Sequence, residues 1–156
     1  MTVTNAMRLL KQAGVEFETG EYEVDESDLS GVHAAEMLGV DPDCVFKTLV
    51  ARGDGRNLYV FCIPVAQELD LKKCASAVGE KKLEMVHVKE LLGLTGYVRG
   101  GCSPIGMKKK YPTLIDETAQ LFDRIYVSAG MRGHQIIVAP DALAEFVEAK
   151  YADLTK

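Results

Sequence analysis

The chain has 156 residues, 47% hydrophobic and 26% charged, a length and composition that predict one folded domain, 1–156, and exclude a disordered chain. A formal net charge of −5 argues against sequence-independent binding of nucleic acid, which needs many lysines and arginines to neutralise phosphates. No apolar stretch approaches the roughly eighteen residues of a membrane span, and no basic start precedes an apolar run, so we expect a cytoplasmic protein without a membrane partner.

Short helices and a hairpin are expected in the first half of the chain. Ser30 can cap one helix at its start, and Gly39 can end it. The turn 52–57 is rich in Gly, Asp and Asn and predicts a hairpin between two strands rich in β-branched and aromatic residues. The expected elements are a helix over 4–13, strands over 15–17 and 22–24, a helix over 32–38, and strands over 44–51 and 58–65.

The second half alternates short strands and helices around a glycine-rich loop over 93–106. Asp70 can cap a helix that stops at Gly79. The expected elements are a helix over 71–78, a strand over 83–86, a helix over 87–92, a strand-like piece over 97–99, strands over 113–116, 124–128 and 135–138, and a helix over 141–150. About seven strands and several short helices predict an α+β domain with a mixed, curved sheet, rather than a doubly wound parallel sheet.

A lysine, Lys47, stands in the middle of an otherwise apolar strand. Alternation places Lys47 on one face of that strand, with Val45 and Leu49, and Thr48 on the other. Because a buried charge costs desolvation, Lys47 either uses its charge, to hold a phosphate or polarise a carbonyl, or reaches water from an edge strand. Thr48 is interpreted as a routine strand residue.

Two glycine-bearing turns are candidate binding loops. The run from Gly100 to Pro104 can direct backbone N–H groups at a carbonyl oxygen or a phosphate, or it can be a tight structural turn. The turn over 128–134 can bring Ser128 or Arg132 beside the first loop, where Arg132 could contact phosphate; a hairpin turn with a solvated arginine is the alternative.

Cysteine and histidine spacing gives no metal or redox signature. The four cysteines form no CxxC pair, and the three histidines have no H-E-x-x-H or comparable spacing, so neither a metal nor a cofactor is expected. Cys102 lies in the glycine loop and could be a nucleophile, but no cysteine–histidine signature accompanies it, which favours a non-catalytic thiol.

Three segments together resemble the YbaK/EbsC-type aminoacyl-transfer-RNA deacylases, which are related to the editing domain of bacterial prolyl-transfer-RNA synthetases. The segments are Val45-Phe46-Lys47-Thr48-Leu49, the run from Gly96 to Lys109, and the run from Ile125 to Gly133. Their order and spacing cover nearly the whole chain. The resemblance implies a compact, barrel-like mixed sheet surrounded by short helices.

The resemblance also implies positions for a site. The central lysine of the family falls on Lys47, the glycine of its Gly-Gly-x-Ser-Pro loop on Gly101, and an N-terminal tyrosine on Tyr22. We therefore expect catalytic roles for Lys47 and Gly101. The substrate-binding candidates, taken with the two loops, are Tyr22, Ser30, Thr48, Gly100, Ser103, Pro104, Ser128 and Arg132.

The function implied by the resemblance is trans-editing: release of a mischarged amino acid, cysteine in many relatives, from transfer RNA of the proline or cysteine type. In such a reaction the substrate's own thiol attacks its ester, Lys47 orients the terminal nucleotide, and amides near Gly101 stabilise the oxyanion. An aromatic residue found in some relatives is replaced around 29–31, which predicts a different amino-acid preference.

The expected partners are the acceptor end of aminoacyl-transfer RNA, with Lys108–Lys110 as a local basic patch, and prolyl-transfer-RNA synthetase as a candidate. Two other functions stay open at this point. One is a non-catalytic module that binds transfer RNA or a synthetase, and the other is a protein that binds a nucleotide or another small molecule through its glycine loops.

Overall fold

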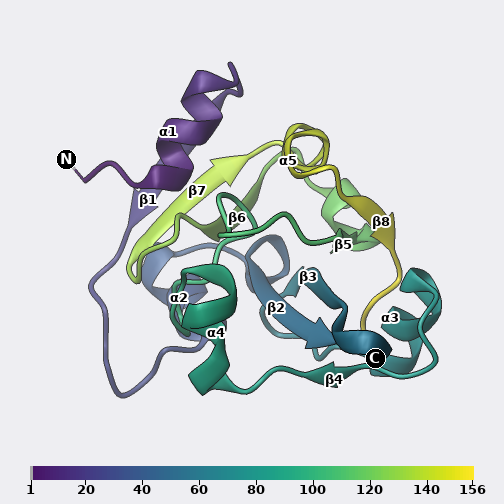
Figure 1. Ribbon diagram of the computed structural model, residues 1–156. Helices are drawn as coiled ribbons and strands as arrows, with labels where there is room; N and C mark the ends of the chain where they lie inside the picture. The colour runs from purple at the N-terminus through teal and green to yellow at the C-terminus, as the bar shows by residue number, and fades with distance from the viewer. Residues whose placement is uncertain (1) are drawn as a thin grey trace.

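Residues 2–156 form five α-helices and eight strands in the computed structural model (Figure 1). The helices are α1 (Asn5–Gln12), α2 (Gly31–Leu38), α3 (Leu71–Val78), α4 (Val88–Thr95) and α5 (Pro140–Val147). The strands are β1 (Phe17–Glu21), β2 (Phe46–Arg52), β3 (Leu58–Pro64), β4 (Glu84–Met85), β5 (Thr113–Asp116), β6 (Ile125–Ser128), β7 (His134–Val138) and β8 (Lys150–Ala152). None of these helices is long and apolar enough to cross a membrane.

The strands form two sheets that meet at β2 and β6. One sheet has three strands in the order β1-β7-β6, and the other has five in the order β4-β2-β3-β5-β8. The pairs β3–β5 and β5–β8 are parallel and the other pairs antiparallel, so the larger sheet is mixed. An isolated parallel bridge between Val45 and Tyr126 links the beginning of β2 to β6.

Local signals fix the ends of several helices where the sequence predicts them. The Ser30 hydroxyl accepts from His33 N at the start of α2, and the Asp70 carboxylate accepts from Lys72 N and Lys73 N at the start of α3. Gly39 and Gly79 then adopt left-handed conformations, with φ of 70° and 76°, that end these two helices. The caps confirm both helix predictions.

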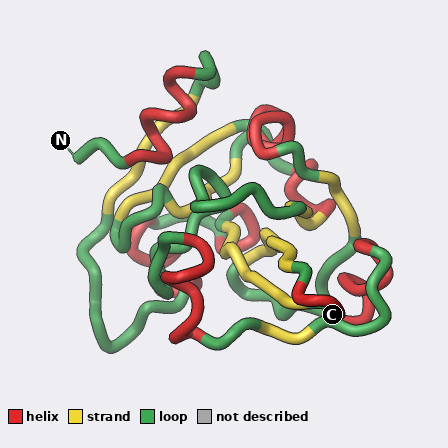
Figure 2. The backbone as a smooth tube through the Cα atoms, viewed as in Figure 1, coloured by secondary structure: helices red, strands yellow, loops and turns green. Residues whose placement is uncertain are grey.

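Hydrophobic packing uses both faces of the larger sheet. One cluster joins α1 and α5 to β6, β7 and one face of the larger sheet, where Cys62 and Ile115 are fully buried. A second cluster packs α3 against the opposite face, through Phe61, Ile63 and Cys74. Burying one such large apolar side chain contributes about 1.5–3 kcal/mol, so packing on both faces stabilises β3 in its place. Figure 2 shows the helices around the strands.

The mixed α+β class and the 44–65 hairpin are confirmed, but several details of the prediction are wrong. Eight strands occur in two sheets, in place of about seven in one barrel-like sheet, and residues 2–156 form no closed barrel. In place of the expected strands over 15–17 and 22–24, one strand, β1, spans Phe17–Glu21 between them, because these residues pair with β7. Residues 97–99 form no strand.

Two helix ends also differ from the prediction. Helix α4 runs through Gly93 to Thr95, and Gly96, with φ of 87°, ends it. Helix α5 ends at Val147, followed by Glu148 with φ of 55°, and Lys150–Ala152 form β8 because they pair in parallel with β5. At its start α5 is capped by Ala139, and the Asp141 carboxylate in the first turn accepts from the Tyr151 hydroxyl at 2.8 Å.

Candidate functional site

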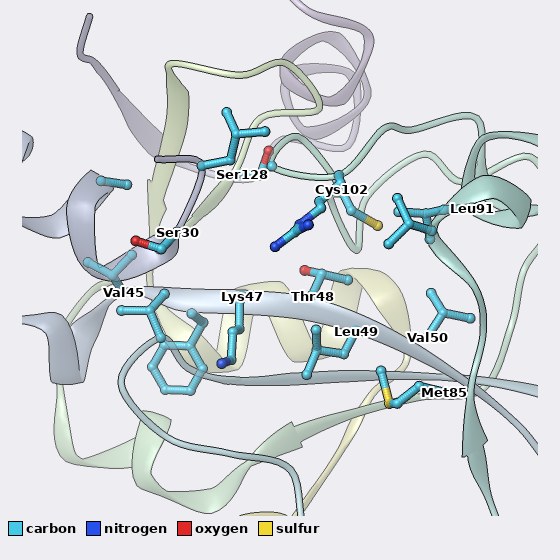
Figure 3. A pocket seen from close by; sticks show the side chains of 18 of the residues that line it. Ser30, Val45, Lys47, Thr48, Leu49, Val50, Met85, Leu91, Cys102 and Ser128 are labelled. Atoms are coloured by element: carbon cyan, nitrogen blue, oxygen red, sulfur yellow. The ribbon is translucent and has the colours of Figure 1, made fainter. Parts of the chain in front are cut away.

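A cavity of about 390 Å³ lies where the two sheets meet, beside β2 and between α2, α4 and the loop at 99–102. Six of the ten site residues expected from the sequence line it: Tyr22, Ser30, Lys47, Thr48, Gly100 and Ser128. These residues come from five different parts of the chain, because Lys47 and Thr48 are neighbours in β2. Figure 3 shows how the side chains of Ser30, Lys47, Thr48 and Ser128, with those of other lining residues, lie around the space.

An unpaired stretch of β2 forms one wall of the cavity. Val45 O accepts from Val65 N of the β3 side, whereas Val50 O accepts from Val86 N on the other edge. Since peptide groups alternate along a strand, those of Phe46 and Thr48 also face away from β3. Strand β4 pairs only with Ala51 and Arg52 and leaves this part of the edge open. Residues from both faces of β2 can therefore line the cavity.

Lys47 and Thr48 lie on opposite faces of β2, as the alternation predicts. In Figure 3 the Thr48 hydroxyl points to the side where Cys102 and Ser128 lie, and Lys47 extends to the other side with Leu49. Lys47 is half-buried, and loss of water lowers the pKa of its ammonium group while the charge of Glu68 raises it. Thr48, rather than Lys47, presents its side chain to the interior.

The floor of the cavity consists of four small polar side chains. Thr48, Cys102, Ser128 and Gln135 all line it, and their exposed fractions are only 9%, 8%, 9% and 6%. The Ser128 hydroxyl oxygen accepts from Gly130 N at 3.1 Å, which leaves its own proton free to donate. Burial raises the pKa of the Cys102 thiol to about 12, so this group is protonated near neutral pH.

The rim carries groups in contact with water. Arg99 and Gly100 are exposed, and Ser30 is exposed at the start of α2, where its hydroxyl already accepts from His33 N at 3.2 Å. Tyr22 is partly buried, and burial raises the pKa of its phenol while a backbone hydrogen bond at Gly133 lowers it. The cations of the lining, Lys47 and Arg99, are thus more exposed than the four floor residues.

The other expected residues do not line the cavity but build its loop. Gly101 is buried, and its N–H donates to Val98 O at 3.0 Å. A Cβ at Gly101 would lie 3.2 Å from Arg132 N, so the close approach of the two loops favours glycine. Ser103 is fully buried, with its hydroxyl accepting from Ile105 N, and Pro104 is buried beside a separate hollow of about 250 Å³.

Arg132 clamps the two glycine-bearing turns together from outside the cavity. Its Nε donates to Arg99 O at 2.8 Å, and its Nη1 lies 3.3 Å from Glu26 Oε2. The two loops are therefore neighbours, as the sequence suggests, but the Arg132 guanidinium already has protein partners.

Gln135 is the floor residue that sequence reasoning did not single out. The available signal was a carboxamide at the start of an apolar strand, Gln135 to Val138, in register with Ser128. Residues directly opposite in an antiparallel pair lie on the same face of the sheet. Ser128 and Gln135 therefore reach the cavity together.

The fold agrees with what is found in known proteins. Residues 29–146 match the aminoacyl-tRNA editing domain, and the chain belongs to this family. It is 49% identical over 152 residues to EbsC of Enterococcus faecalis, named as a proposed Cys-tRNA(Pro)/Cys-tRNA(Cys) deacylase, covering 97% of this chain and 93% of that protein. The family resemblance read from the sequence is thereby confirmed.

Two further comparisons give a relative in sequence and a solved structure of similar fold. The proline–tRNA ligase of Shouchella clausii is 32% identical over 122 residues, which are 78% of this chain but only 21% of the ligase. A solved structure described as a proposed trans-editing enzyme for prolyl tRNA synthetase has the same fold, with a TM-score of 0.84, 24% identity and 99% of each chain covered.

Proposed function

We propose that this chain is a free-standing aminoacyl-tRNA deacylase that cleaves the ester of a mischarged amino acid, with cysteine on tRNA(Pro) or tRNA(Cys) as the first candidate. The observation that carries the proposal is the cavity at the open edge of β2 in a chain of the editing family. Its volume, about 390 Å³, suits an aminoacyl group with part of its ribose. The relative EbsC, whose sequence this chain matches over 93% of its length, is named as a proposed deacylase of these substrates.

The polarity of the cavity supports the same proposal. Lys47 and Arg99 supply positive charge for a terminal phosphate, while the floor supplies neutral hydroxyl groups. The free proton of Ser128 can donate to the ester carbonyl oxygen, and the open edge of β2 offers the Thr48 peptide group to the ester. Gly101 has a smaller role in this proposal, because its N–H is engaged with Val98 O.

The substrate's own thiol is the nucleophile that we propose for a cysteinyl ester. Its sulfur forms a bond to the ester carbonyl carbon, the bond from that carbon to the ribose oxygen breaks, and the thiol proton goes to the ribose oxygen. The products are uncharged transfer RNA and a cyclic thioester, which water then opens. Cys102 is not needed as a nucleophile, in keeping with a thiol that burial holds protonated.

Release of amino acid from a panel of charged transfer RNAs tests the proposal. We expect the protein to deacylate at least one cysteinyl or other small aminoacyl substrate, and Lys47→Ala to lower kcat/KM roughly tenfold to a hundredfold by removing a charged contact. The matched control is Lys72→Ala, which changes an exposed lysine on α3 and should leave the rate unchanged.

A non-catalytic binding module would give the opposite result. Tight binding of charged transfer RNA without release of amino acid from any member of the panel would overturn the deacylase proposal. Equal rates for Lys47→Ala and Lys72→Ala would leave a deacylase in which Lys47 has no role.

A further inference from the structure

A buried carboxamide without a partner lies in the floor of the cavity. Gln135 is 6% exposed, and its Oε1 has no hydrogen-bond partner among residues 2–156. Leaving such an oxygen unpaired costs about 1–3 kcal/mol, and buried groups of this kind are few in folded proteins. A ligand that donates a hydrogen bond at this position would remove that cost.

The surroundings of Gln135 explain why no protein group satisfies it. Its strand, β7, lies between β1 and β6, and its neighbours across the two pairs are Gly20 and Ser128. Gly20 has no side chain to offer, and the Ser128 hydroxyl, which accepts from Gly130 N, makes no hydrogen bond to Gln135 Oε1. The carboxamide is fixed in the middle strand of a sheet, so its position is set by backbone pairing.

The charges around the cavity identify which part of an aminoacyl ester suits Gln135. Such an ester carries a positive α-ammonium group and, through its nucleotide, negative phosphate. The described residues that line the cavity include Lys47 and Arg99 but neither aspartate nor glutamate. The ammonium group therefore has to be met by neutral acceptors, away from the two cations.

The cations and the neutral acceptor lie at different depths in the cavity. Arg99 is exposed and Lys47 half-buried, whereas Gln135 belongs to the buried floor. An ester that enters with its amino acid first and leaves its phosphate at the rim matches both ends of the cavity at once. A carboxamide oxygen accepts well from an ammonium donor, and hydrogen bonds to charged groups are the stronger class.

We infer that the Gln135 carboxamide accepts a hydrogen bond from the α-ammonium group of the bound aminoacyl ester and thereby selects substrates with a free amine. This inference rests on the proposed deacylase function. It assigns Gln135 to substrate binding and predicts that N-acetylated aminoacyl-tRNA is a poor substrate, because the acetylated nitrogen loses its charge and two of its three donors.

The test compares free and N-acetylated forms of one substrate in three variants. Gln135→Met keeps the volume but removes the acceptor, so kcat/KM for the free amine should fall roughly tenfold to a hundredfold with little change for the acetylated form. Gln135→Glu keeps an acceptor and should retain or increase the preference for the free amine. Gln120→Met, at an exposed position of the 3₁₀-helix Glu117–Leu121, is the control and should match the wild type.

Stability provides a readout that a merely structural role would not give. Removing an unpaired buried oxygen should leave the melting temperature of Gln135→Met equal to or above that of the wild type. Equal loss of activity on both substrate forms, or a marked loss of stability, would overturn the assignment.

Binding of a stable analogue separates this inference from the proposed activity. We would measure the affinity for an amide-linked alanyl-adenosine with a free or an acetylated amine, which requires no turnover. A preference for the free amine that is lost in Gln135→Met supports the inference even without deacylation, and an unchanged preference refutes it even in an active enzyme.

Discussion

The ammonium group of Lys47 stands beside the open edge of β2 in a half-buried position that lowers its pKa through loss of water. The charge of Glu68 opposes this effect but does not reverse it. A charge held where it weakens the fold is typical of a functional group, because selection for stability alone would replace it. Lys47 therefore fits a role in binding better than a role in stability.

Replacing Lys47 by methionine should raise stability at neutral pH. The folded protein binds the lysine proton less tightly than the unfolded chain does, so the folded state is penalised below the folded pKa. That penalty disappears as pH rises through the folded pKa toward the ordinary value of about 10.4. Urea unfolding at several pH values should give Lys47→Met a higher free energy of unfolding than the wild type at pH 7. This difference should become smaller at higher pH.

The exposed Lys72 supplies the control for this experiment. Lys72→Met should track the wild type at each pH. If the difference in free energy of unfolding between Lys47→Met and the wild type stays constant with pH, packing of the apolar methionine side chain, and not the charge of lysine, is responsible.

Among the secondary-structure elements, the end of β5 is a junction that holds distant parts of the chain together. Asp116, the last residue of β5, is 1% exposed. One of its carboxylate oxygens accepts from Leu154 N at 3.0 Å, and the other accepts from the backbone and hydroxyl of Thr118, at 3.2 and 2.6 Å. Three hydrogen bonds thus join β5 to the next 3₁₀-helix and to the segment after β8.

Asp116→Ala should lower the free energy of unfolding by roughly 2–4 kcal/mol, because it leaves buried donors without an acceptor. Chemical denaturation of the purified variant measures this loss, and Asp123→Ala, at an exposed position, is the control. Hydrogen exchange at Leu154 should accelerate specifically. A loss below about 0.5 kcal/mol, within the range of ordinary surface substitutions, would show that Asp116 is not a structural junction.

Elements with local signals could be predicted from the sequence, and elements defined by distant partners could not. Helix α3 has its cap at Asp70 and its glycine stop at Gly79, so ten consecutive residues contain the whole signal. Strand β8 pairs only with β5, more than thirty positions earlier, and its residues continue the amphipathic pattern of α5. The helical prediction for 141–150 therefore extends past the true end at Val147.

In the candidate site, too, residues with a local sequence signal could be predicted, and residues defined by distant neighbours could not. The glycine-rich loop was visible because its composition is unusual, but composition did not show that Gly100 and Cys102 would face the cavity while Ser103 turned inward. Gln135 was missed because its distinguishing property is a missing partner, which depends on Gly20 and Ser128 in the neighbouring strands.

Across the whole molecule, the cavity exists because the two sheets contact each other at β2 and β6 without forming one continuous sheet. The bridge between Val45 and Tyr126 brings β2 to β6, while β4 pairs only with the far end of β2. The gap between these contacts is the open edge that forms the cavity wall. On the proposed function, the chemistry is confined to this small site. A chain with net charge −5 would then need separate cations to attract transfer RNA.

Lys108, Lys109 and Lys110 are placed to supply such cations. Lys108 N donates to Thr95 O at the end of α4, the helix from which Leu91 lines the cavity. Lys110 forms an ion pair with Glu148, so part of its charge is already compensated. We therefore expect most of the attraction for phosphate to come from the first two lysines.

Changing all three lysines to glutamine should weaken binding of charged transfer RNA and flatten its salt dependence, with the log–log slope smaller by roughly 1.5–2. Fluorescence titration at several salt concentrations measures that slope. Turnover or binding of a short aminoacyl-adenosine analogue should stay unchanged, because the cavity is untouched. A triple change of the exposed Lys72, Lys81 and Lys82 removes the same charge elsewhere. Equal flattening by the two triple variants would indicate an effect of net charge and exclude a dedicated contact at 108–110.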